Sequence, residues 1–586
     1  MRQWMVAAKK ADFYAIAEKF HVDPVVARII RNREVIGEKN IRIYLGGNLS
    51  DLSDPHQMKD MDRLVEILAQ KIRKQVHIRI IGDYDVDGVT SSHLFLTALR
   101  RVGAKVDVVI PHRIQDGYGL SLHLLQQAKE DGVDTILTCD NGIAAIDEIA
   151  WAKAQKMTVL VTDHHAVPFE EHEGRRTEKK SLADAVVNPH QQDCGYPYKE
   201  LCGAGVAWNV IRVLYENYDM DKREAEDLLD FVAMATVCDV MSLTGENRIL
   251  VKEGLKRIRH TKNIGLQALM QACNVQPENI SAYHFGYVLG PCVNATGRLD
   301  TARHALRLFE TGQETEAEEI ARDLVDLNQE RKELTLQGVE MAKKLCEEGG
   351  YENDPVLVLF LPDVHESIAG LIAGRIREMY NRPVFVLTRG EEGVKGSGRS
   401  TENYSMYENM CGCAELFTKF GGHPMAAGLS LPEENVEKFR RKINENCPLT
   451  VEEVCPDIHI DMAMPVGYAS TELVHQFALL EPFGKDNPSP LFADRNLSIS
   501  RMWLIGKNRN VLRMSVLSEY GQPVPVIFFG DVETLFAYFT EKFGQEEVEN
   551  ARHGRKNRIL FSMVYTAKID FYQGNENLQL EMKYYR

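Results

Sequence analysis

Three features common in secreted and membrane proteins are missing from the 586-residue sequence. No apolar run reaches the roughly 20 residues that a membrane-spanning helix needs, and residues 1–10 carry neither the apolar core nor the cleavage site of a signal peptide. The eleven cysteines include no CxxC pair, and one close pair, Cys411 and Cys413, is more simply incidental than half of a zinc site. We therefore expect a reduced, cytoplasmic protein without a membrane segment.

A surplus of positive charge is also missing. The 85 acidic residues outnumber the 69 basic ones, for a formal net charge of −16, which argues against a basic surface that wraps duplex DNA. A narrow basic channel, or bound metal ions that carry the positive charge, would still be compatible with this balance. The hydrophobic content of 44 % is that of an ordinary globular protein, and the length allows about three or four domains.

The most informative stretch is residues 78–92. The β-branched run 78–81 predicts a buried strand, and Gly88 permits a tight turn soon after it. Between this strand and Gly88, three carboxylates stand at every second position: Asp83, Asp85 and Asp87. Carboxylates crowded on one side repel one another unless a divalent cation neutralises them, although Asp and Gly are also ordinary residues of a solvated turn.

Short apolar runs alternate with amphipathic segments between residues 76 and 190. The runs are Val76–Ile81, Val106–Ile110, Thr135–Thr138, Thr158–Thr162 and Ala185–Val187. This alternation predicts an α/β fold with a parallel sheet and helices on both of its faces. In such sheets ligands bind beyond the carboxyl ends of the strands, so the polar residues at those ends are the candidates for function.

Acidic and imidazole side chains follow several of these apolar runs. They are Asp83, Asp85 and Asp87 after the first strand, Asp140 after the third, Asp163, His164 and His165 after the fourth, and Asp239 after a later run. Such mixed ligands favour Mn²⁺, Mg²⁺ or Zn²⁺, and their number suggests two ions with a bridging carboxylate. Two adjacent ions can activate a water and clamp a phosphoryl oxygen. Because His164 and His165 are neighbours, we expect one to bind metal and the other to face the substrate.

These motifs resemble those of the DHH phosphoesterase superfamily. The matching residues are Asp85-x-Asp87, Asp140-Asn-Gly, Asp163-His-His and Asp239. The longer segment 82–88, Gly-Asp-Tyr-Asp-Val-Asp-Gly, is similar to that of the RecJ branch, and the similarity continues through residues 111–119, 202–205 and 290–298. The resemblance implies a 5′→3′ exonuclease that releases mononucleotides from single-stranded DNA in repair and recombination, with two divalent ions, Mn²⁺ or Mg²⁺.

The resemblance also implies roles for single residues. The core metal ligands would be Asp85, Asp87, Asp140, His164 and Asp239, with Asp83 as an accessory or outer ligand. His165 would lie nearest the scissile phosphate, and Asp163 would orient a neighbouring imidazole.

Three residues would contact substrate: Arg113, Asn294 and Arg298. From the residues alone, either arginine could be a solvated surface residue, although a guanidinium suits a terminal phosphate. Cys292 stands where the family usually has an arginine, which removes one possible phosphate contact.

A second strand–helix pattern follows a charged, proline-free segment at 303–350. Within that segment we expect one long exposed helix, 317–346, that acts as a spacer. Small residues at 369–374 predict a helix that packs closely on a sheet, and Gly396-Ser-Gly-Arg offers a phosphate cradle. The pattern resembles the DHH-associated domain. The resemblance implies substrate contacts from Ser397, Arg399, Gly421, Gly422 and His423, with help from Arg375.

The C-terminal part predicts a small antiparallel barrel. Its β-rich runs are Leu497–Ile505, Val511–Leu517, Val524–Phe529, Ile559–Ala567 and Leu578–Tyr585. RecJ-like chains carry an OB-fold at this point. Two basic clusters, Arg501, Trp503, Lys507, Arg509 and Arg513 in one and Arg552, Arg555, Lys556 and Arg558 in the other, could guide a single strand or be solubilising surface.

We thus expect five parts: an N-terminal helical cap at 1–70, a DHH catalytic domain at 71–302, a linker helix at 303–350, a DHH-associated substrate-binding domain at 351–450 and an OB-fold at 451–586. The expected partner is single-stranded DNA, with a helicase and a single-strand-binding protein as candidates, and the chain is expected to be a monomer. One alternative is a DHH phosphodiesterase on short oligoribonucleotides or cyclic dinucleotides, although such relatives typically lack the cap and the barrel. Another is a non-catalytic DNA-binding scaffold, which is disfavoured because every metal carboxylate is present.

Overall fold

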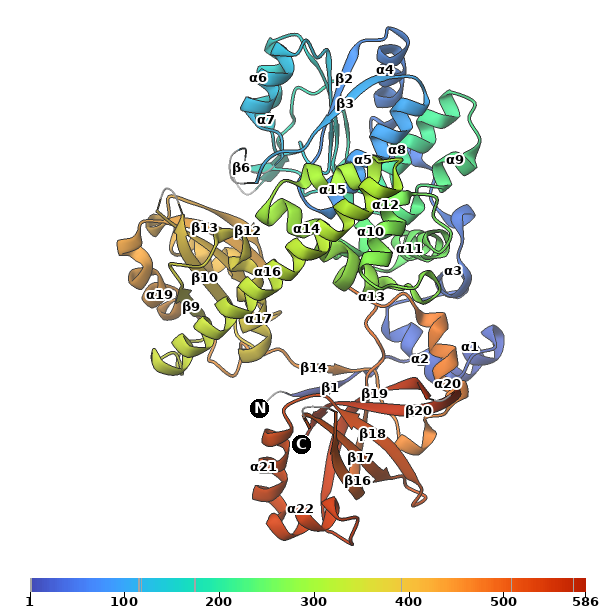
Figure 1. The fold of residues 1–586 in the computed structure, drawn as a ribbon, viewed down its shortest axis with the longest axis vertical. Coiled ribbons are helices and arrows are strands. Elements are labelled where there is room, and N and C mark those ends of the chain that lie inside the picture. Colours follow the sequence, from blue (N-terminus) through green and yellow to red (C-terminus); the bar gives the residue numbers. More distant parts are fainter. Residues whose placement is uncertain are drawn as a thin grey trace. The chain divides into compact units, whose positions relative to one another are not determined.

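The computed structural model describes residues 3–113, 116, 119–172, 175–390, 393–506, 509–572 and 574–586 (Figure 1). Four residues of the 111–119 motif (114, 115, 117 and 118) and Lys507 lie outside these ranges. The chain forms two compact units, one from residue 48 to residue 456 and the other from the N-terminal residues up to Gly47 together with Asp457–Arg586. Within the described ranges, no helix is both long and apolar enough to cross a membrane.

The first unit contains a parallel sheet in the strand order β3-β2-β4-β5-β8. The strands are β2 (His77–Ile81), β3 (Lys105–Val109), β4 (Thr135–Cys139), β5 (Thr158–Thr162) and β8 (Ala185–Val187). The predicted parallel sheet is therefore confirmed. Strands β3 and β4 pair with β2 on its opposite sides. The sheet therefore has a topological switch point beside β2, where ligands bind in such folds.

Successive side chains along the strands of this sheet pack into two separate hydrophobic cores, one on each face. Ile80 and Leu137 pack into a core that includes α4 (Met61–Arg73), α5 (Val86–Arg101) and α8 (Gly203–Asn217). Ile81 and Ile136, one residue away on the same strands, pack against α6 (Leu122–Glu130) and α7 (Ile146–Ala154). Successive strand side chains point to opposite faces, so β-branched and aliphatic runs without polar breaks produce a sheet that is covered on both sides.

Further helices and one hairpin complete the domain around the first sheet. They are α9 (Lys222–Glu226), α10 (Leu229–Cys238), α11 (Gly245–Ile258), α12 (Ile264–Ala272), α13 (Ala282–His284), α14 (Gly290–Leu299) and α15 (Ala302–Glu310), and a hairpin is formed by β6 (Phe169–His172) and β7 (Arg175–Glu178). The connecting helix α16 (Glu314–Glu348) runs on from them to a second sheet (Figure 1). It is less exposed than predicted, because Ile320 and Leu324 pack in the core of the first sheet while Val339 and Ala342 pack in the core of the second sheet.

The second sheet has the order β12-β13-β11-β10-β9. Its strands are β9 (Leu357–Phe360), β10 (Val384–Gly390), β11 (Gly393–Arg399), β12 (Lys419–His423) and β13 (Ala426–Leu431). Helices α16 and α17 (Ala369–Tyr380) cover one face, and α18 (Met406–Cys411) and α19 (Val436–Glu445) cover the other. The predicted close packing of a small-residue helix is confirmed at Gly370, where an added Cβ would lie 2.8 Å from Oγ of Ser397.

The second unit is built on a barrel in the order β15-β16-β17-β18-β20-β19, closed by pairing of β16 with β19. The strands are β15 (Met462–Ala463), β16 (Phe492–Ile505), β17 (Val511–Leu517), β18 (Pro523–Phe528), β19 (Leu560–Tyr572) and β20 (Asn575–Tyr585). The barrel is not purely antiparallel as predicted, because β18 and β20 pair in parallel. Two helices that the sequence did not indicate, α21 (Val532–Phe543) and α22 (Gln545–Arg552), return the chain between β18 and β19.

The N-terminal helices belong to this second unit. They are α1 (Phe13–Phe20), α2 (Pro24–Asn32) and α3 (Glu38–Gly46), and α20 (Thr471–Phe477) lies with them in one core. Strand β1 (Trp4–Val6) pairs with β14 (Ile458–Ile460), and the buried carboxylate of Asp461 accepts two hydrogen bonds from the Arg33 guanidinium. The structure divides the expected cap over residues 1–70: the residues up to Gly47 belong to the second unit, whereas those from Asn48 on, with helix α4, belong to the first.

Candidate metal centre

The loop after β2 brings three carboxylates to the edge of the sheet. Asp85 caps the N-terminus of α5, where its Oδ1 accepts the backbone N–H of Gly88 at 3.0 Å. Gly88 is required here, since an added Cβ would lie 2.4–2.6 Å from backbone atoms of Asp83. The carboxylate of Asp87 accepts the backbone N–H groups of Gly203 (2.6 Å) and Ala204 (2.7 Å) at the first turn of α8. These bonds hold the carboxylates of Asp85 and Asp87 in fixed positions.

The ends of β4 and β5 supply the next side chains. Asp140 follows β4 with a φ of 61°, a left-handed conformation that Asp and Asn tolerate better than most residues. Gly203 lets α8 approach it, because an added Cβ would lie 2.6 Å from the Asp140 Cβ. After β5, Oδ1 of Asp163 accepts the backbone N–H groups of His164 (2.7 Å) and His165 (3.0 Å). Asp239 comes instead from the C-cap of helix α10.

The donor atoms of these residues form overlapping groups. Nε2 of His164 lies 3.0 Å from Oδ1 of Asp140, 3.6 Å from Oδ2 of Asp239 and 3.7 Å from Oδ2 of Asp87. Donor sets within 4.8 Å of one another are Asp83, Asp85 and Asp140; Asp87, His164 and Asp239; and Asp140, His164 and His165. Asp140 belongs to two of these sets, as expected for a carboxylate that bridges two ions.

The pKa shifts of the carboxylates fit cation binding. Burial raises the pKa of Asp83 well above its ordinary value, and the charge of Asp85 adds to the shift. Burial, followed by the charge of Asp87, likewise raises the pKa of Asp85 and of Asp140. Oδ1 of Asp83 and Nε2 of His164 are buried without a hydrogen bond. Buried polar groups in this state are costly unless a cation satisfies them, so the residues present fit two divalent ions.

The two histidines differ in charge state. Burial lowers the pKa of His164, which favours the neutral imidazole that metals bind. For His165, burial opposes the charged form, but the hydrogen bond from Nδ1 to Oδ1 of Asp163 (2.8 Å) and the charge of Asp163 raise the pKa to about 9. Asp163 thus orients His165, and the predicted division of roles is consistent with this geometry.

Arginines gather beside the acidic cluster. The guanidinium of Arg113 lies over the ring of Tyr84, with 4.9 Å from Cζ to the centroid. Arg298 donates a hydrogen bond to the Ser367 carbonyl at 2.6 Å. Burial, followed by the charge of Arg113, lowers the pKa of Arg298 to about 10 and also lowers that of Arg399. Cationic side chains close enough to perturb one another indicate a site for an anion.

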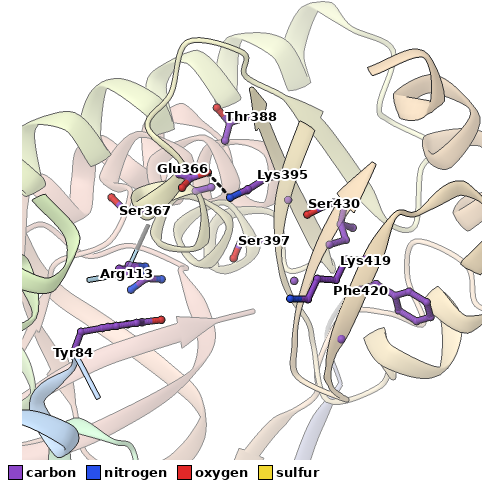
Figure 2. A pocket seen from close by; sticks show the side chains of 15 residues that line it. Tyr84, Arg113, Glu366, Ser367, Thr388, Lys395, Ser397, Lys419, Phe420 and Ser430 are labelled. Atoms are coloured by element: carbon purple, nitrogen blue, oxygen red, sulfur yellow. Dashed lines mark ion pairs between the residues drawn. The ribbon is translucent and has the colours of Figure 1, made fainter. Parts of the chain in front are cut away.

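A cavity of about 430 Å³ lies next to this arginine group. Figure 2 shows Tyr84 and Arg113 on one side of it and Ser397 on the other. Its lining comes from both sheets' domains: Tyr84, Arg113, Glu366, Ser367, Ala369, Thr388, Lys395, Gly396, Ser397, Lys419, Phe420, Gly421, Gly428, Leu429 and Ser430. Lys395, Lys419 and Ser430 are lining residues that the sequence did not single out, since only the alternation of side chains along a strand could have indicated them.

Several other residues predicted to contact substrate do not line this cavity. Asn294 accepts the backbone N–H of Val86 at 3.2 Å, which ties α14 to the metal loop. Arg399 and His423 are not among the residues that line the cavity, and Gly422 faces Ala427. Arg375 is 70 % exposed, lies 3.8 Å from Glu378 and is not among the residues that line the cavity, so its contact with substrate stays a prediction.

Two other sequence features have structural explanations. Cys292 is buried, with its Sγ 3.8 Å from that of Cys273 and 3.4 Å from Nδ2 of Asn328, so the side chain packs in the core. In the barrel, Cζ of Arg501 lies 5.5 Å from the centroid of the Trp503 ring. Arg513 on β17 is the cross-strand partner of Trp503 on β16.

The second basic cluster of the barrel is partly ion-paired. Arg552 lies 2.8 Å from Glu549, and Arg558 lies 3.9 Å from Glu547. These pairs favour the solubilising interpretation for this cluster.

Three family models match the chain in the order found in the structure. The DHH family, N-terminal domain, matches residues 77–236, the DHHA1 domain matches 353–447 and the RecJ OB domain matches 460–584. A DHH sheet with an acidic strand-end cluster, joined to a DHHA1 domain, defines the DHH class of phosphoesterases.

Relatives that match most of the chain show which family within this class the chain belongs to. The single-stranded-DNA-specific exonuclease RecJ of Haemophilus influenzae is 32% identical over 581 residues, which is 96% of each chain. That of Bacillus subtilis is 33% identical over 87% of this chain, although the match spans only 63% of the B. subtilis protein. The chain therefore belongs to the RecJ family.

Solved structures agree with this assignment. The crystal structure of RecJ from Thermus thermophilus in complex with Mn²⁺ matches with a TM-score of 0.81 and 25% identity, covering 100% of this chain and 79% of that one. A second crystal structure, of exonuclease RecJ bound to manganese, matches 66% of this chain and 94% of its own with a TM-score of 0.56 and 32% identity.

Proposed function

We propose that this protein is a metal-dependent exonuclease that degrades single-stranded DNA from the 5′ end and releases mononucleotides. The observation that carries the proposal is a pair of donor sets linked through the contact of Asp140 with His164, placed beside a cavity lined by Arg113. Membership in the RecJ family supports it, since relatives across most of the chain are single-stranded-DNA-specific exonucleases. The proposal assigns catalysis to residues 71–302 and substrate binding to residues 351–450, with 303–350 as the connecting helix.

Two ions, Mn²⁺ or Mg²⁺, would be held by the acidic cluster. Asp83, Asp85 and Asp140 form one donor set, and Asp87, His164 and Asp239 form another; Oδ1 of Asp140, which lies 3.0 Å from Nε2 of His164, would link the two. When bound, the ions supply an activated water and neutralise charge on the phosphoryl oxygens. The chain's own contribution is to fix these donors through the turns and helix N-termini described above.

His165 would act on the scissile phosphate. Its Nδ1 lies 2.8 Å from Oδ1 of Asp163, and this hydrogen bond orients the ring for the substrate. A protonated imidazole there donates a hydrogen bond to a phosphoryl oxygen and stabilises negative charge as it develops. The proposed role of Asp163 is to hold this ring in position.

Arg113 would bind the 5′-terminal phosphate. Its guanidinium is positioned by the Tyr84 ring and lines the cavity opposite Ser397, and planar guanidinium groups bind phosphate through paired hydrogen bonds. An anion bound between them would place the first nucleotide between Arg113 and the acidic cluster. We propose that such a placement leads to the release of one nucleotide at a time.

The finer biological setting is also part of the proposal. A site of this kind needs single strands, which duplex DNA does not offer, so we expect a helicase to supply them and a single-strand-binding protein to keep them open during repair and recombination. We expect the chain to act as a monomer, in the cytoplasm where its substrate lies.

The test is degradation of a long single strand that carries different labels at its two ends. With Mn²⁺ or Mg²⁺ we expect mononucleotides from the 5′ label first, no cleavage of a blunt duplex and no reaction with chelator. Loss of the 3′ label first would overturn the proposed polarity. Survival of long strands while dinucleotides are cut would favour a phosphodiesterase for short oligoribonucleotides or cyclic dinucleotides.

A further inference from the structure

The cavity floor is made by one face of three paired strands in the second sheet. On β11, Lys395, Ser397 and Arg399 share this face, because side chains alternate along a strand. Gly396 and Gly398 face the other way, where an added Cβ would meet Leu387 and Met406 in the core. The pairing of β11 with β13 and of β13 with β12 then fixes which residues lie side by side across the floor.

Cross-strand pairs divide this face into three rows. The first row is Arg399, Ala426 and His423; the second is Ser397, Gly428 and Gly421; the third is Lys395, Ser430 and Lys419. We call the third row the lysine row. Residues two apart on a strand are about 7 Å apart, so the lysine row lies about that far beyond Ser397, on the side away from Arg399.

Two of the three residues in the second row, Gly421 and Gly428, have no side chain. An added Cβ at Gly421 would meet nothing within 4 Å, and one at Gly428 would meet only a backbone oxygen at 4.0 Å. The floor is therefore open from Ser397 to the lysine row, and both rows line the same cavity of about 430 Å³. Figure 2 shows Lys395 and Lys419 on the sheet side of this space, across from Arg113.

The lysine row carries positive charge into the cavity. Nζ of Lys395 lies 3.3 Å from Oε2 of Glu366, whereas Lys419 is exposed and makes no ion pair among the residues that the structure describes. Two ammonium groups and the Ser430 hydroxyl offer several donors to one anion. A terminal monophosphate would need only the part of the cavity next to Ser397. The lysine row lies beyond that part, and its positive charge indicates that it binds a further anionic group.

We propose that the lysine row binds the additional phosphates of a 5′-di- or triphosphorylated strand, so that such ends are substrates as well. This inference rests on the proposed function. The row extends the cavity in line with the Ser397 site, and each added phosphate brings the negative charge that its lysines match.

The reaction balances as a hydrolysis. Water adds across the bond between the 3′ oxygen of the first nucleotide and the phosphorus of the second, with the hydroxyl going to phosphorus and the proton to the 3′ oxygen. The first product from a triphosphorylated end is therefore a nucleoside triphosphate, and later products are monophosphates.

The experiment compares single strands of one sequence that carry a 5′-monophosphate or a 5′-triphosphate. For the wild-type chain we expect both to be degraded, with a nucleoside triphosphate as the first product of the second strand. In Lys395→Ala/Lys419→Ala we expect the ratio of KM for the triphosphorylated strand to KM for the monophosphorylated strand to rise on the order of tenfold, the effect of losing a charge-assisted hydrogen bond. Glu366→Gln, which releases Lys395 from its ion pair, should lower that ratio.

A matched control is Lys438→Ala, since Lys438 lies on α19 and bonds to Asn435 away from the cavity; it should leave the ratio unchanged. An equal KM increase for both strands in the double variant would overturn the proposal, because the row would then hold the strand itself. Refusal of triphosphorylated ends by the wild-type chain would overturn it too.

Binding measured by fluorescence anisotropy in chelator tests the row independently of hydrolysis. Failure of the proposed exonuclease function would abolish degradation of both strands, yet the double variant should still lose its preference for the triphosphorylated strand. An unchanged ratio of binding constants would contradict the role of the lysine row.

Discussion

Nε2 of His164 lies 3.0 Å from Oδ1 of Asp140, so an imidazole from the end of β5 and a carboxylate from the end of β4 meet at one point. Asp140 also belongs to the donor set of Asp83 and Asp85 on the loop after β2. Three neighbouring strand ends thus converge on a single carboxylate. This convergence explains why Asp140 is the residue whose change should have the largest effect on metal binding.

Asp140→Asn should abolish hydrolysis while keeping the fold. Asn tolerates the left-handed φ of 61° at this position and is the same size as Asp, but it lacks the charge that a bridging ligand needs. We expect activity to fall by more than about 100-fold, the upper end for losing a group that only orients a ligand. In chelator, the melting temperature should rise, because burial and the charge of Asp87 oppose ionisation of Asp140 in the folded chain. Wild-type activity in this variant would rule out a bridging role.

Asp163→Asn should impair the chemical step more than DNA binding. The Asp163 carboxylate accepts three hydrogen bonds through Oδ1, two from backbone N–H groups and one from Nδ1 of His165. An amide supplies one acceptor oxygen and two donors, so the His165 ring would lose its fixed orientation. Steady-state kinetics on single-stranded DNA should show kcat reduced by about 10- to 100-fold with KM nearly unchanged. An increase in KM alone would instead mean that Asp163 shapes the binding surface.

Arg113→Ala should weaken the use of 5′-phosphorylated ends. A charge-assisted hydrogen bond to phosphate is worth about 1.5–3 kcal/mol, so we expect kcat/KM on a 5′-phosphorylated strand to fall by about 10- to 100-fold. The same strand with a 5′-hydroxyl should be affected less. Arg441→Ala is the matched control, because this exposed arginine lies 3.9 Å from Glu445 on α19 and does not line the cavity. Equal losses on both strands would show that Arg113 does not recognise the terminal phosphate.

Asp230→Asn should change how stability depends on pH. Asp230 is buried at the start of α10, where burial raises its pKa from 3.8 to about 6 despite the hydrogen bond from Thr261. Between these values the folded chain binds more protons than the unfolded chain, so the free energy of unfolding falls as pH rises through this window. The full loss is on the order of 3 kcal/mol and persists above about pH 6.

The Asp230→Asn variant keeps the size of the side chain without the charge. Its gain in melting temperature over the wild-type chain should therefore be larger at about pH 7.5 than at about pH 4.5. Thermal unfolding at the two pH values checks this, and a gain that is the same at both would contradict the raised pKa.

Local patterns were enough to predict the strand ends of the catalytic sheet. Each of β2, β4 and β5 is a short aliphatic run followed at once or within two residues by Asp, so the run and its carboxylate are read from neighbouring residues. Asp239 is harder to place, because α10 is apolar on every side and its hydrophobic pattern does not separate a buried helix from a strand.

Features that depend on distant pairing were not predictable. The lysine row exists only because Ser430 lies between Lys395 and Lys419 across three strands, and nothing local to any of the three residues indicates that register. The same holds for β1, whose partner β14 lies more than 400 residues further along the chain.

Calorimetric titration of the metal-free chain with Mn²⁺ tests the central claim most directly. The two donor sets linked by Asp140 predict two ions per wild-type chain and weaker or incomplete binding in Asp140→Asn, which removes the linking carboxylate. Electron paramagnetic resonance of the loaded protein should also show coupling between the two ions. A single uncoupled Mn²⁺ per chain, or two that bind equally well to the variant, would contradict a two-metal centre bridged by Asp140.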